Sequence, residues 1–394
     1  MHYHVCRFSK HVKRSYHIPA PRDDAKGYID GVMQAIRESD IDLVVPMHEE
    51  IFYLAEEAQT NLELRSKLLS PPFHTLIMLH NKWEFSQFLQ QNSLGVPKSS
   101  LCKSYEDVLA LGRDVEWAVK PVYGRANTSV FHLEPGKPLP TEEEIDISDG
   151  QHYIAQEWVK GQRFCTYSVL WNGKVSSLSV YPVQDTIDGS VGSSCVYFES
   201  TVNPKITEYV ERLGSCLPGV SGQVALDVIQ NDPGDVVAIE CNPRATSGIH
   251  LYSSTKRLAR VLTCHIPVDA PWTEPEPVRV GPPNRAKRKV APGMLMWKRS
   301  HADNHYKAVA IEYLNHMKRL IFSRDVMWSW TDLTPSLMQP FLLTSYYEIC
   351  REKNLKLPTM FQHDYVWEPR GEHLAQVRKM FNHDPEKGDG TAVD

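Results

Sequence analysis

The chain has 394 residues, 42% of them hydrophobic, which is enough for two or three domains with sizeable cores. Its 43 basic and 48 acidic residues give a net charge of −5, which argues against a nucleic-acid partner because such proteins usually carry a broad basic surface. The 8 cysteines form no Cys-x-x-Cys pair, which favours reduced thiols over disulfides or a zinc site. No signal peptide or long apolar run is present, so we expect a cytoplasmic protein without a membrane partner.

The N-terminal segment predicts a piece of an α/β sheet. Apolar residues recur at helical spacing from Asp23 to Asp40, and Ile41–Pro46 has the pattern of a buried strand. The loop after that strand contains Glu49 and Glu50, at the strand end where α/β sheets usually bind ligands. Either glutamate is a candidate substrate contact, although an acidic cap on the next helix is the stronger interpretation.

The next segments alternate between helix and strand. Asn81–Gln91 predicts an amphipathic helix, and Val115–Val122 predicts a strand that carries Lys120. The small polar loop at 123–129 resembles a phosphate cradle and is a candidate lid. Further strands are predicted at Tyr153–Val159, Phe164–Trp171 and Val175–Tyr181, the last two joined by an Asn172-Gly173 hairpin turn.

Two short runs rich in β-branched residues flank a turn-forming stretch and predict a β-hairpin. They are Gln223–Ile229 and Val236–Glu240. Residues across an antiparallel pair lie close together, which lets Asp227 and Glu240 converge, with Asn242 on the same face as Glu240. Oxygen donors of this kind suit Mg²⁺, and Arg244 adds a cation that can bind phosphate. Solvated acids on a hairpin edge are the plainer alternative for any single pair.

The C-terminal third predicts mainly helices after a proline-rich boundary at Pro271–Pro283. The expected helices cover Met294–Trp297, Val309–Phe322 and Ser336–Cys350, and a polar, disordered tail is expected from Asn382. We expect the tryptophans within 325–332 to pack in the core of this region, although a place in a substrate pocket is the alternative.

Several of these motifs occur in one order along the chain. They are Asn81-Lys82-Trp83, Ala118-Val119-Lys120-Pro121, Gln156–Gly161, Asp227 and Glu240-Cys241-Asn242-Pro243-Arg244. This ordered set resembles the ATP-grasp superfamily, particularly the branch of carbamoyl-phosphate synthase and the carboxylate–amine ligases, from Pro46 to Tyr252. The resemblance implies an ATP-grasp fold of two α+β subdomains, preceded by a shortened α/β domain and followed by a mostly helical region. We expect residues 1–72 to form the shortened α/β domain and residues 73–270 the ATP-grasp domain. Residues 271–283 would be a linker, 284–381 the mostly helical region and 382–394 a disordered tail.

The resemblance also implies a role for each matching residue. Lys82 and Lys120 would contact phosphates, Glu157 and the backbone at Val159 would hold adenine, Asp227, Glu240 and Asn242 would bind Mg²⁺, and Arg244 would lie near the γ-phosphate. Lys120 and Arg244 would assist phosphoryl transfer by neutralising charge. Each residue has a plainer alternative, such as a surface cation for Lys82 or an edge-strand charge for Glu157. Gly161 is followed by Gln162 where the family often has an acid that contacts ribose, so ribose recognition is left open.

The implied activity is an ATP- and Mg²⁺-dependent ligase, in which Mn²⁺ is an expected substitute for Mg²⁺. A small carboxylate, such as an amino acid, would become an acyl phosphate and then an amide on attack by an amine. Two alternatives stay open: another acceptor for the acyl phosphate, and a nucleotide-binding biosynthetic scaffold protein without turnover. The expected partners are the small-molecule acid and amine, and a homodimer is the assembly considered.

Overall fold

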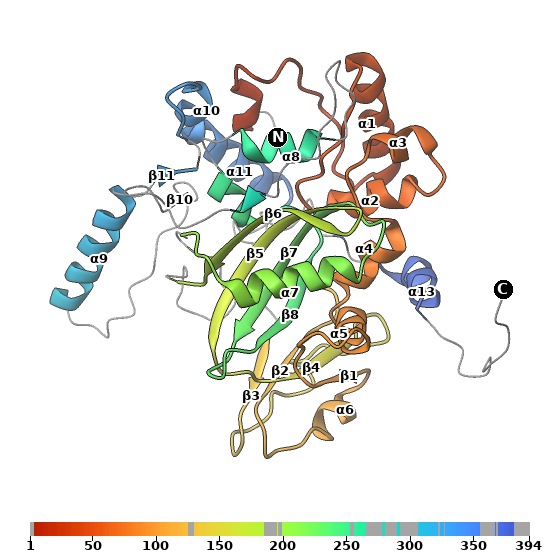
Figure 1. Cartoon of the computed structure of the whole chain (residues 1–394), viewed down its shortest axis with the longest axis vertical. Helices are drawn as coiled ribbons and strands as arrows, with labels where there is room; N and C mark the ends of the chain where they lie inside the picture. Colours follow the sequence, from red (N-terminus) through yellow and green to blue (C-terminus); the bar gives the residue numbers. More distant parts are fainter. Residues whose placement is uncertain are drawn as a thin grey trace.

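The computed structural model describes residues 4–124, 130–184, 195, 199–252, 256–264, 278–279, 290–291, 306–321, 324–326, 328–354, 367 and 369–381. The molecule has two main sheets: the five-stranded sheet lies at its centre, the four-stranded sheet lies at its lower end in the view of Figure 1, and most helices from both ends of the chain lie above the five-stranded sheet. This is the α+β architecture that the sequence predicts. None of the helices in the described ranges is long and apolar enough to cross a membrane.

The N-terminal part is built from short helices. They are η1 (Val5–Phe8), α1 (Ala25–Ser39), α2 (Glu50–Glu57), α3 (Leu62–Lys67) and α4 (Phe73–His80). The helix predicted from Asp23 to Asp40 is confirmed as α1, whose first turn is capped by Asp24. The strand predicted at Ile41–Pro46 is wrong, because within the described residues this stretch makes only one bridge, from Val44 to Leu68. Leu68 belongs to a short extended stretch directly after α3, so the two segments pair over one bridge only.

The first sheet has four strands in the order β1-β4-β2-β3, and every neighbouring pair is antiparallel. The strands are β1 (Ser99–Cys102), β2 (Trp117–Pro121), β3 (Phe131–Leu133) and β4 (Tyr153–Glu157). The short helix α6 (Tyr105–Leu109) covers it and begins with a capping box between Ser104 and Asp107. Helix α5 (Lys82–Gln91) precedes the sheet and is capped by the Asn81 side chain, which accepts from two backbone amides of its first turn.

The second sheet has the order β8-β7-β5-β6-β9. Its strands are β5 (Gln162–Trp171), β6 (Lys174–Pro182), β7 (Gly222–Gln230), β8 (Val236–Asn242) and β9 (Val278–Arg279). Both predicted hairpins are present as the antiparallel pairs β5–β6 and β7–β8. Between β5 and β6, Asn172 and Gly173 both have positive φ, at 50° and 78°, as a type I′ turn requires.

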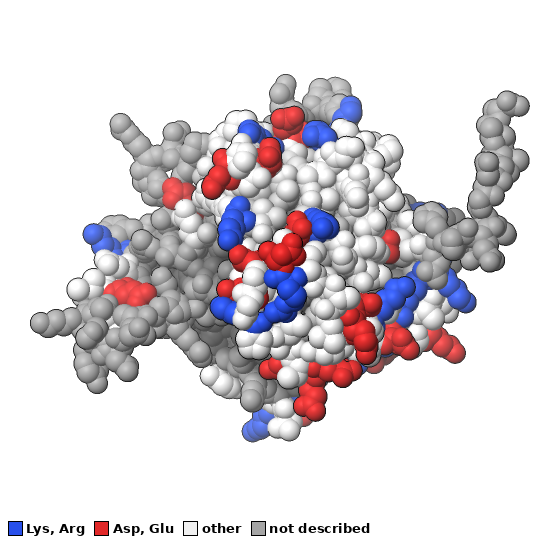
Figure 2. Space-filling model, turned by 90° about the horizontal axis from the view of Figure 1, so that it is seen from below, with Lys and Arg blue, Asp and Glu red and all other residues white. Residues whose placement is uncertain are grey.

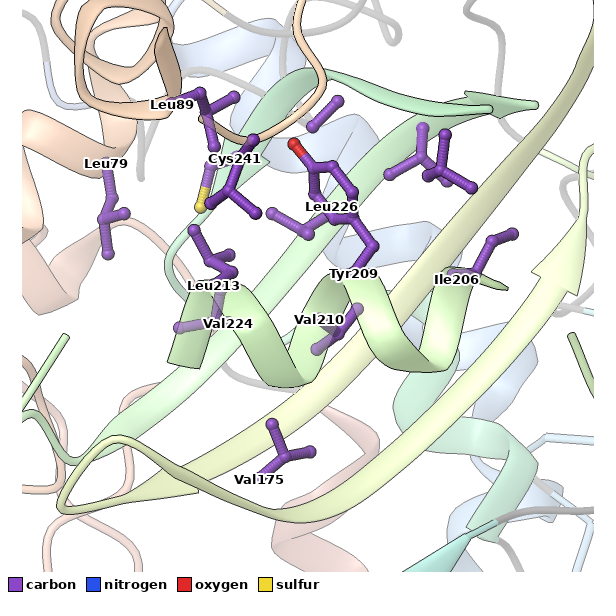
Figure 3. Close-up of a cluster of buried hydrophobic side chains, with 14 of the residues drawn as sticks. Leu79, Leu89, Val175, Ile206, Tyr209, Val210, Leu213, Val224, Leu226 and Cys241 are labelled. Carbon is purple, nitrogen blue, oxygen red and sulfur yellow. The ribbon is translucent and has the colours of Figure 1, made fainter. Parts of the chain in front are cut away.

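Helices cover both faces of the second sheet. Helix α7 (Pro204–Ser215) lays an apolar face across the sheet, where Ile206, Val210 and Leu213 meet strand residues such as Val224 and Leu226 (Figure 3). Leucines of α4 and α5 extend the same cluster, which ties the N-terminal helices to the sheet. On the other face, η2 (Ser247–Tyr252) and α8 (Arg257–Thr263) pack on β5 through a second apolar cluster. The strands that bear the predicted metal ligands therefore sit on a rigid base.

The C-terminal part is mainly helical, as predicted. It contains β10 (Val290–Ala291), α9 (Tyr306–Ile321), β11 (Arg324–Asp325), α10 (Thr334–Leu337), α11 (Gln339–Glu352) and α13 (Gly371–Lys379). The predicted core packing of the tryptophans is wrong, since Trp328 and Trp330 are 41% and 79% exposed and contact each other edge to face. The predicted helix at Met294–Trp297, the tail and all of the proline-rich stretch except residues 278–279 lie outside the described residues.

The end of the described chain returns to the N-terminal helices. Trp367 is 2% exposed and stacks on Phe52 of α2 with ring centroids 4.7 Å apart, and its edge meets Phe73 of α4. Helix α13 lies beside α4 in Figure 1, and Val377 joins the same buried cluster. On the face in Figure 2, basic and acidic side chains are interspersed over the described surface.

Candidate active site

Strands β7 and β8 place two carboxylates opposite each other. Asp227 pairs directly with Glu240 in the antiparallel register, and a β-bulge follows Asp227. A bulge reorients the side chains beside it and is common next to active sites. The backbone register therefore brings the two acids together on the hairpin, as the sequence predicts. Asn242 lies two positions beyond Glu240, opposite Ala225, on the same strand face.

Lys82 reaches this pair from the start of helix α5. Its side chain is only 5% exposed, its Nζ donates to the Gly124 carbonyl at 3.0 Å, and it lies 3.7 Å from the Glu240 Oε1 atom. Lys82 is thus not the solvent-exposed helix cation of the plainer interpretation. The Asn81 cap fixes the helix start, so the ammonium is held between the loop after β2 and strand β8.

Lys120 of β2 is the second buried cation. It is 6% exposed, and its Nζ donates to the Ile239 carbonyl at 2.9 Å, which brings the first sheet against β8. The pKa of Lys120 is lowered to about 8, mainly by burial and also by the charge of Lys82, while Glu240 and Asp227 oppose the shift. An ammonium with few protein partners in a dry site is well suited to bind phosphate oxygens.

Asp227 is the more strongly perturbed acid. Burial raises its pKa, and the charge of Glu240 raises it further. The thiol of Cys165, which pairs with Asp227 across β5 and β7, hydrogen-bonds to the carboxylate and opposes the shift. The raised pKa of Asp227, a buried acid beside a second carboxylate, favours a bound cation, which would stabilise its ionised form.

Arg244 is held at the end of β8. The residue is 8% exposed; its Nη2 donates to the Asn242 side-chain oxygen at 2.9 Å, and its Nη1 donates to the Ala245 carbonyl at 3.1 Å. The Nε–H group is buried and makes no hydrogen bond. Two of the predicted site residues, Asn242 and Arg244, are therefore in contact, and the Nε–H donor of the guanidinium remains for a ligand.

Glu49 is the acid of the N-terminal loop that reaches this site. It is fully buried, and its Oε1 lies 3.6 Å from Nη2 of Arg244. Glu50 instead turns back to accept from the backbone amides of Met47 and His48, at 2.8 and 3.0 Å. Of the two glutamates considered from the sequence, the structure thus brings Glu49 to the site and uses Glu50 as a local cap.

Glu157 and Val159 lie in the connection between the two sheets. Glu157 ends β4, its backbone amide donates to the Lys98 carbonyl, and its side chain lies 3.6 Å from the Lys98 ammonium. Gly161 turns the chain into β5 so close to β7 that a Cβ there would sit 2.3 Å from the Gln230 carbonyl oxygen. The structure gives neither Glu157 nor Val159 a contact with the acids of β7 and β8, and their adenine role stays a prediction. Of the candidate lid, residues 125–129 lie outside the described residues.

Sequence reasoning missed three contacts of this site. Cys165 of β5 lies opposite Asp227 of β7, Glu49 faces Arg244, and Trp367 donates its backbone amide to Glu49 Oε2 at 2.9 Å. The register of β5 on β7 could have indicated Cys165 once the strands were known. Nothing local in the sequence marks Trp367, because its contact joins segments far apart in the chain.

The donor set fits Mg²⁺ in its chemistry. Asp227, Glu240 and Asn242 all offer oxygen atoms, which Mg²⁺ prefers, and the remaining ligands of such sites are usually water and phosphate. The described residues contain no group of three or more His, Cys, Asp or Glu that could hold a metal alone. A site of two carboxylates and an amide would therefore depend on the nucleotide to complete it.

Comparisons with known proteins identify a domain family and a similar fold. Residues 79–248 match the family of ATP-grasp domains. The L-amino acid ligase from Bacillus licheniformis has a similar fold, with a TM-score of 0.51 and 19% identity over 67% of this chain and 65% of that one. The chain thus covers slightly less than two thirds of that protein. No curated protein matches the sequence significantly.

Two further solved structures are similar at lower scores. Biotin carboxylase from Campylobacter jejuni has a TM-score of 0.47 and 14% identity over 61% of this chain and 58% of that chain. The N5-carboxyaminoimidazole ribonucleotide synthetase from Thermotoga maritima has a TM-score of 0.42 and 18% identity over 61% of each chain.

The two sheets and the residues between them define an ATP-grasp fold. Residues 79–248 match the ATP-grasp domain family, in agreement with the resemblance of the ordered motifs.

Proposed function

We propose that the chain is an ATP- and Mg²⁺-dependent ligase that joins a small carboxylic acid to an amine, with ADP and phosphate as the other products. The observation that carries this proposal is the convergence of Lys82, Lys120 and the Asp227–Glu240 pair. The two lysines come from different elements and are buried beside two acids, an arrangement costly to fold unless it serves a ligand. The ATP-grasp family and the similarity to an L-amino acid ligase support the same chemistry.

The reaction has two steps. A carboxylate oxygen attacks the γ-phosphorus of ATP, the bond from that phosphorus to the bridging oxygen breaks, and ADP leaves with an acyl phosphate remaining. The amine then attacks the acyl carbon, loses a proton, and displaces phosphate to give the amide. Water must be kept away, since it would hydrolyse the acyl phosphate.

The chain's own residues would supply position and charge in this scheme. Asp227, Glu240 and Asn242 would hold Mg²⁺, which when bound neutralises phosphate charge and polarises the γ-phosphoryl group. Lys82 and Lys120 would bind phosphate oxygens, and Arg244 would stabilise the charge of the transferred group. Glu157 and the Val159 backbone are proposed for adenine. Mn²⁺ is proposed to replace Mg²⁺ with retained activity.

The proposed partners are the small-molecule acid and amine. The proposed location is the cytoplasm, and the proposed assembly is a homodimer. The division into regions at 72, 270, 283 and 381 is likewise part of the proposal.

ADP release in pools of amino acids and amines tests this function. The proposal expects ADP only when ATP, a divalent cation, a carboxylate and an amine are all present, and mass spectrometry then identifies the amide. ADP that needs the acid alone, with the acyl group trapped by hydroxylamine, would indicate a different acceptor. Saturable MgATP binding without ADP in any pool would contradict turnover and favour a nucleotide-binding scaffold.

A further inference from the structure

Two segments outside the ATP-grasp domain meet at its arginine. Arg244 belongs to the matched range, whereas Glu49 precedes it and Trp367 follows it along the chain. Glu49 connects the two, because its Oε2 accepts from the Trp367 backbone amide at 2.9 Å while its Oε1 lies 3.6 Å from Arg244 Nη2. The three residues are all buried.

Glu49 neutralises the buried charge of Arg244. A buried guanidinium without a counter-charge is strongly destabilising, and Glu49 supplies a negative charge within ion-pair distance of Arg244. The same Nη2 that faces Glu49 donates to the side chain of Asn242, so Glu49 and Asn242 together fix two directions of the guanidinium plane. The Nε–H edge of that plane remains without a hydrogen bond.

Trp367 in turn fixes Glu49. Its indole is stacked on Phe52, which lies on the helix that begins directly after Glu49, and its edge faces Tyr123 with ring centroids 5.9 Å apart. Tyr123 follows the strand that carries Lys120. The stacked ring holds the peptide group of Trp367 in place, and that peptide group holds the carboxylate.

We propose that Glu49 is a positioning residue for Arg244 and that Trp367 keeps Glu49 in its place, so that the C-terminal segment is a working part of the nucleotide site. This inference rests on the proposed function in one respect, the placement of Arg244 at the γ-phosphate. Loss of the Glu49 charge then lets the guanidinium turn away from the γ-phosphate, while groups that contact the rest of the nucleotide are unaffected.

A comparison of MgATP with MgADP separates positioning from a general structural role. Calorimetric titration of Glu49→Gln is expected to show MgATP binding weakened about tenfold, the size of one charge-assisted hydrogen bond. MgADP binding should change less than about twofold, because MgADP has no γ-phosphate for Arg244 to reach. Equal weakening of both nucleotides would overturn the proposal, since it would mean that Glu49 only supports the fold.

A double-mutant cycle tests whether Glu49 acts through Arg244. Arg244→Ala is expected to weaken MgATP selectively, and adding Glu49→Gln should produce no further loss. Losses that multiply in the double variant would overturn the proposal. The matched control is Glu56→Gln, on the same helix and in contact with His373 of the C-terminal segment but not with Arg244; it should bind both nucleotides normally.

Trp367→Ala is expected to weaken MgATP binding selectively, as Glu49→Gln does. In the double variant, Trp367→Ala should cause no further loss of MgATP affinity. Trp367→Phe keeps a stacking ring and the backbone amide, and should restore MgATP binding to within about threefold of the parent protein; failure of this rescue in a folded variant would overturn the role of Trp367. All of these titrations are made without acid or amine. If the parent protein binds MgATP but makes no amide, the proposed function fails while the positioning test keeps its meaning.

Discussion

Asp227 and Glu240 face each other across strands β7 and β8, and the Lys82 ammonium lies 3.7 Å from the Glu240 carboxylate. Burial and the charge of Glu240 raise the pKa of Asp227, which favours a bound cation at this pair, and the lysines beside it favour phosphate. This relationship between charges underlies the predictions on nucleotide chemistry.

Glu240→Gln is expected to abolish amide formation while the protein stays folded. The amide keeps the shape of the side chain but loses the charge that would hold Mg²⁺, and the relief of repulsion with Asp227 offsets the loss of the ion pair with Lys82. Rates of ADP release over a range of Mg²⁺ concentrations check this, with thermal unfolding as the control for folding. Normal turnover in the variant would show that the metal is held elsewhere.

We expect the affinity for MgATP to fall as the pH rises through about 8. The pKa of Lys120 is lowered to that value, so its ammonium loses the positive charge that binds phosphate. Above that pH, binding should take up a proton, which titrations in buffers of different ionisation enthalpy detect. Lys120→Arg stays charged and should lose this pH dependence. An unchanged affinity from pH 7 to about 9.5 in the parent protein would contradict the assignment.

The same lysine gives a stability prediction of defined sign. Between about 8 and the ordinary value of 10.5, the unfolded chain binds a proton at Lys120 that the folded chain does not. The contribution of Lys120 to the free energy of unfolding therefore rises with pH across this window, and the cost of burying its charge is full below it. Urea unfolding of the parent protein and of Lys120→Met over this pH range isolates the effect. If the free energy of unfolding changed with pH equally in both proteins, the prediction would be contradicted.

Leu213→Ala is expected to lower the free energy of unfolding by about 2–5 kcal/mol, because Leu213 is 1% exposed in the cluster between α7 and the second sheet (Figure 3). Leu62→Ala is the matched control, since Leu62 is 69% exposed, and its effect should stay within about 0.5 kcal/mol. Urea unfolding at constant pH measures both. Similar losses in the two variants would mean that α7 is not packed as described.

Gly161→Ala tests the connection between the two sheets. The added Cβ would approach the Gln230 carbonyl oxygen to 2.3 Å, so β5 and β7 must shift apart, at a cost of about 1–3 kcal/mol. Gly150→Ala meets only an ordinary contact at 3.6 Å and is the control. Unfolding curves compare the two variants, and a neutral effect at position 161 would contradict the close approach of these strands.

The parts of the site that lie within one hairpin could be predicted from the sequence. A short turn fixes the register of β7 on β8, so the meeting of Asp227 and Glu240 follows from local spacing. The order of Lys82, Lys120 and the β8 motif indicated the superfamily for the same reason, since each motif is local. The burial of both lysines agrees with the phosphate role but does not itself test it.

The remaining features depend on contacts between distant segments. Ile41–Pro46 has the composition of a buried strand, but only one bridge can form because its neighbour is a short stretch after a helix. Trp328 and Trp330 look like core residues by type, yet both face solvent, whereas Trp367 is buried against α2. Residue type does not determine which tryptophan finds a partner, because tertiary packing decides it.

The central claim is that a substrate carboxylate receives the γ-phosphoryl group of ATP at this site. Amino acids labelled with ¹⁸O in their carboxyl groups test it directly, because an acyl phosphate passes one of those oxygens to the phosphate that is released. The expected result is one ¹⁸O atom in the phosphate for each amide formed, read by ³¹P NMR or mass spectrometry. Amide formation with unlabelled phosphate would contradict the account.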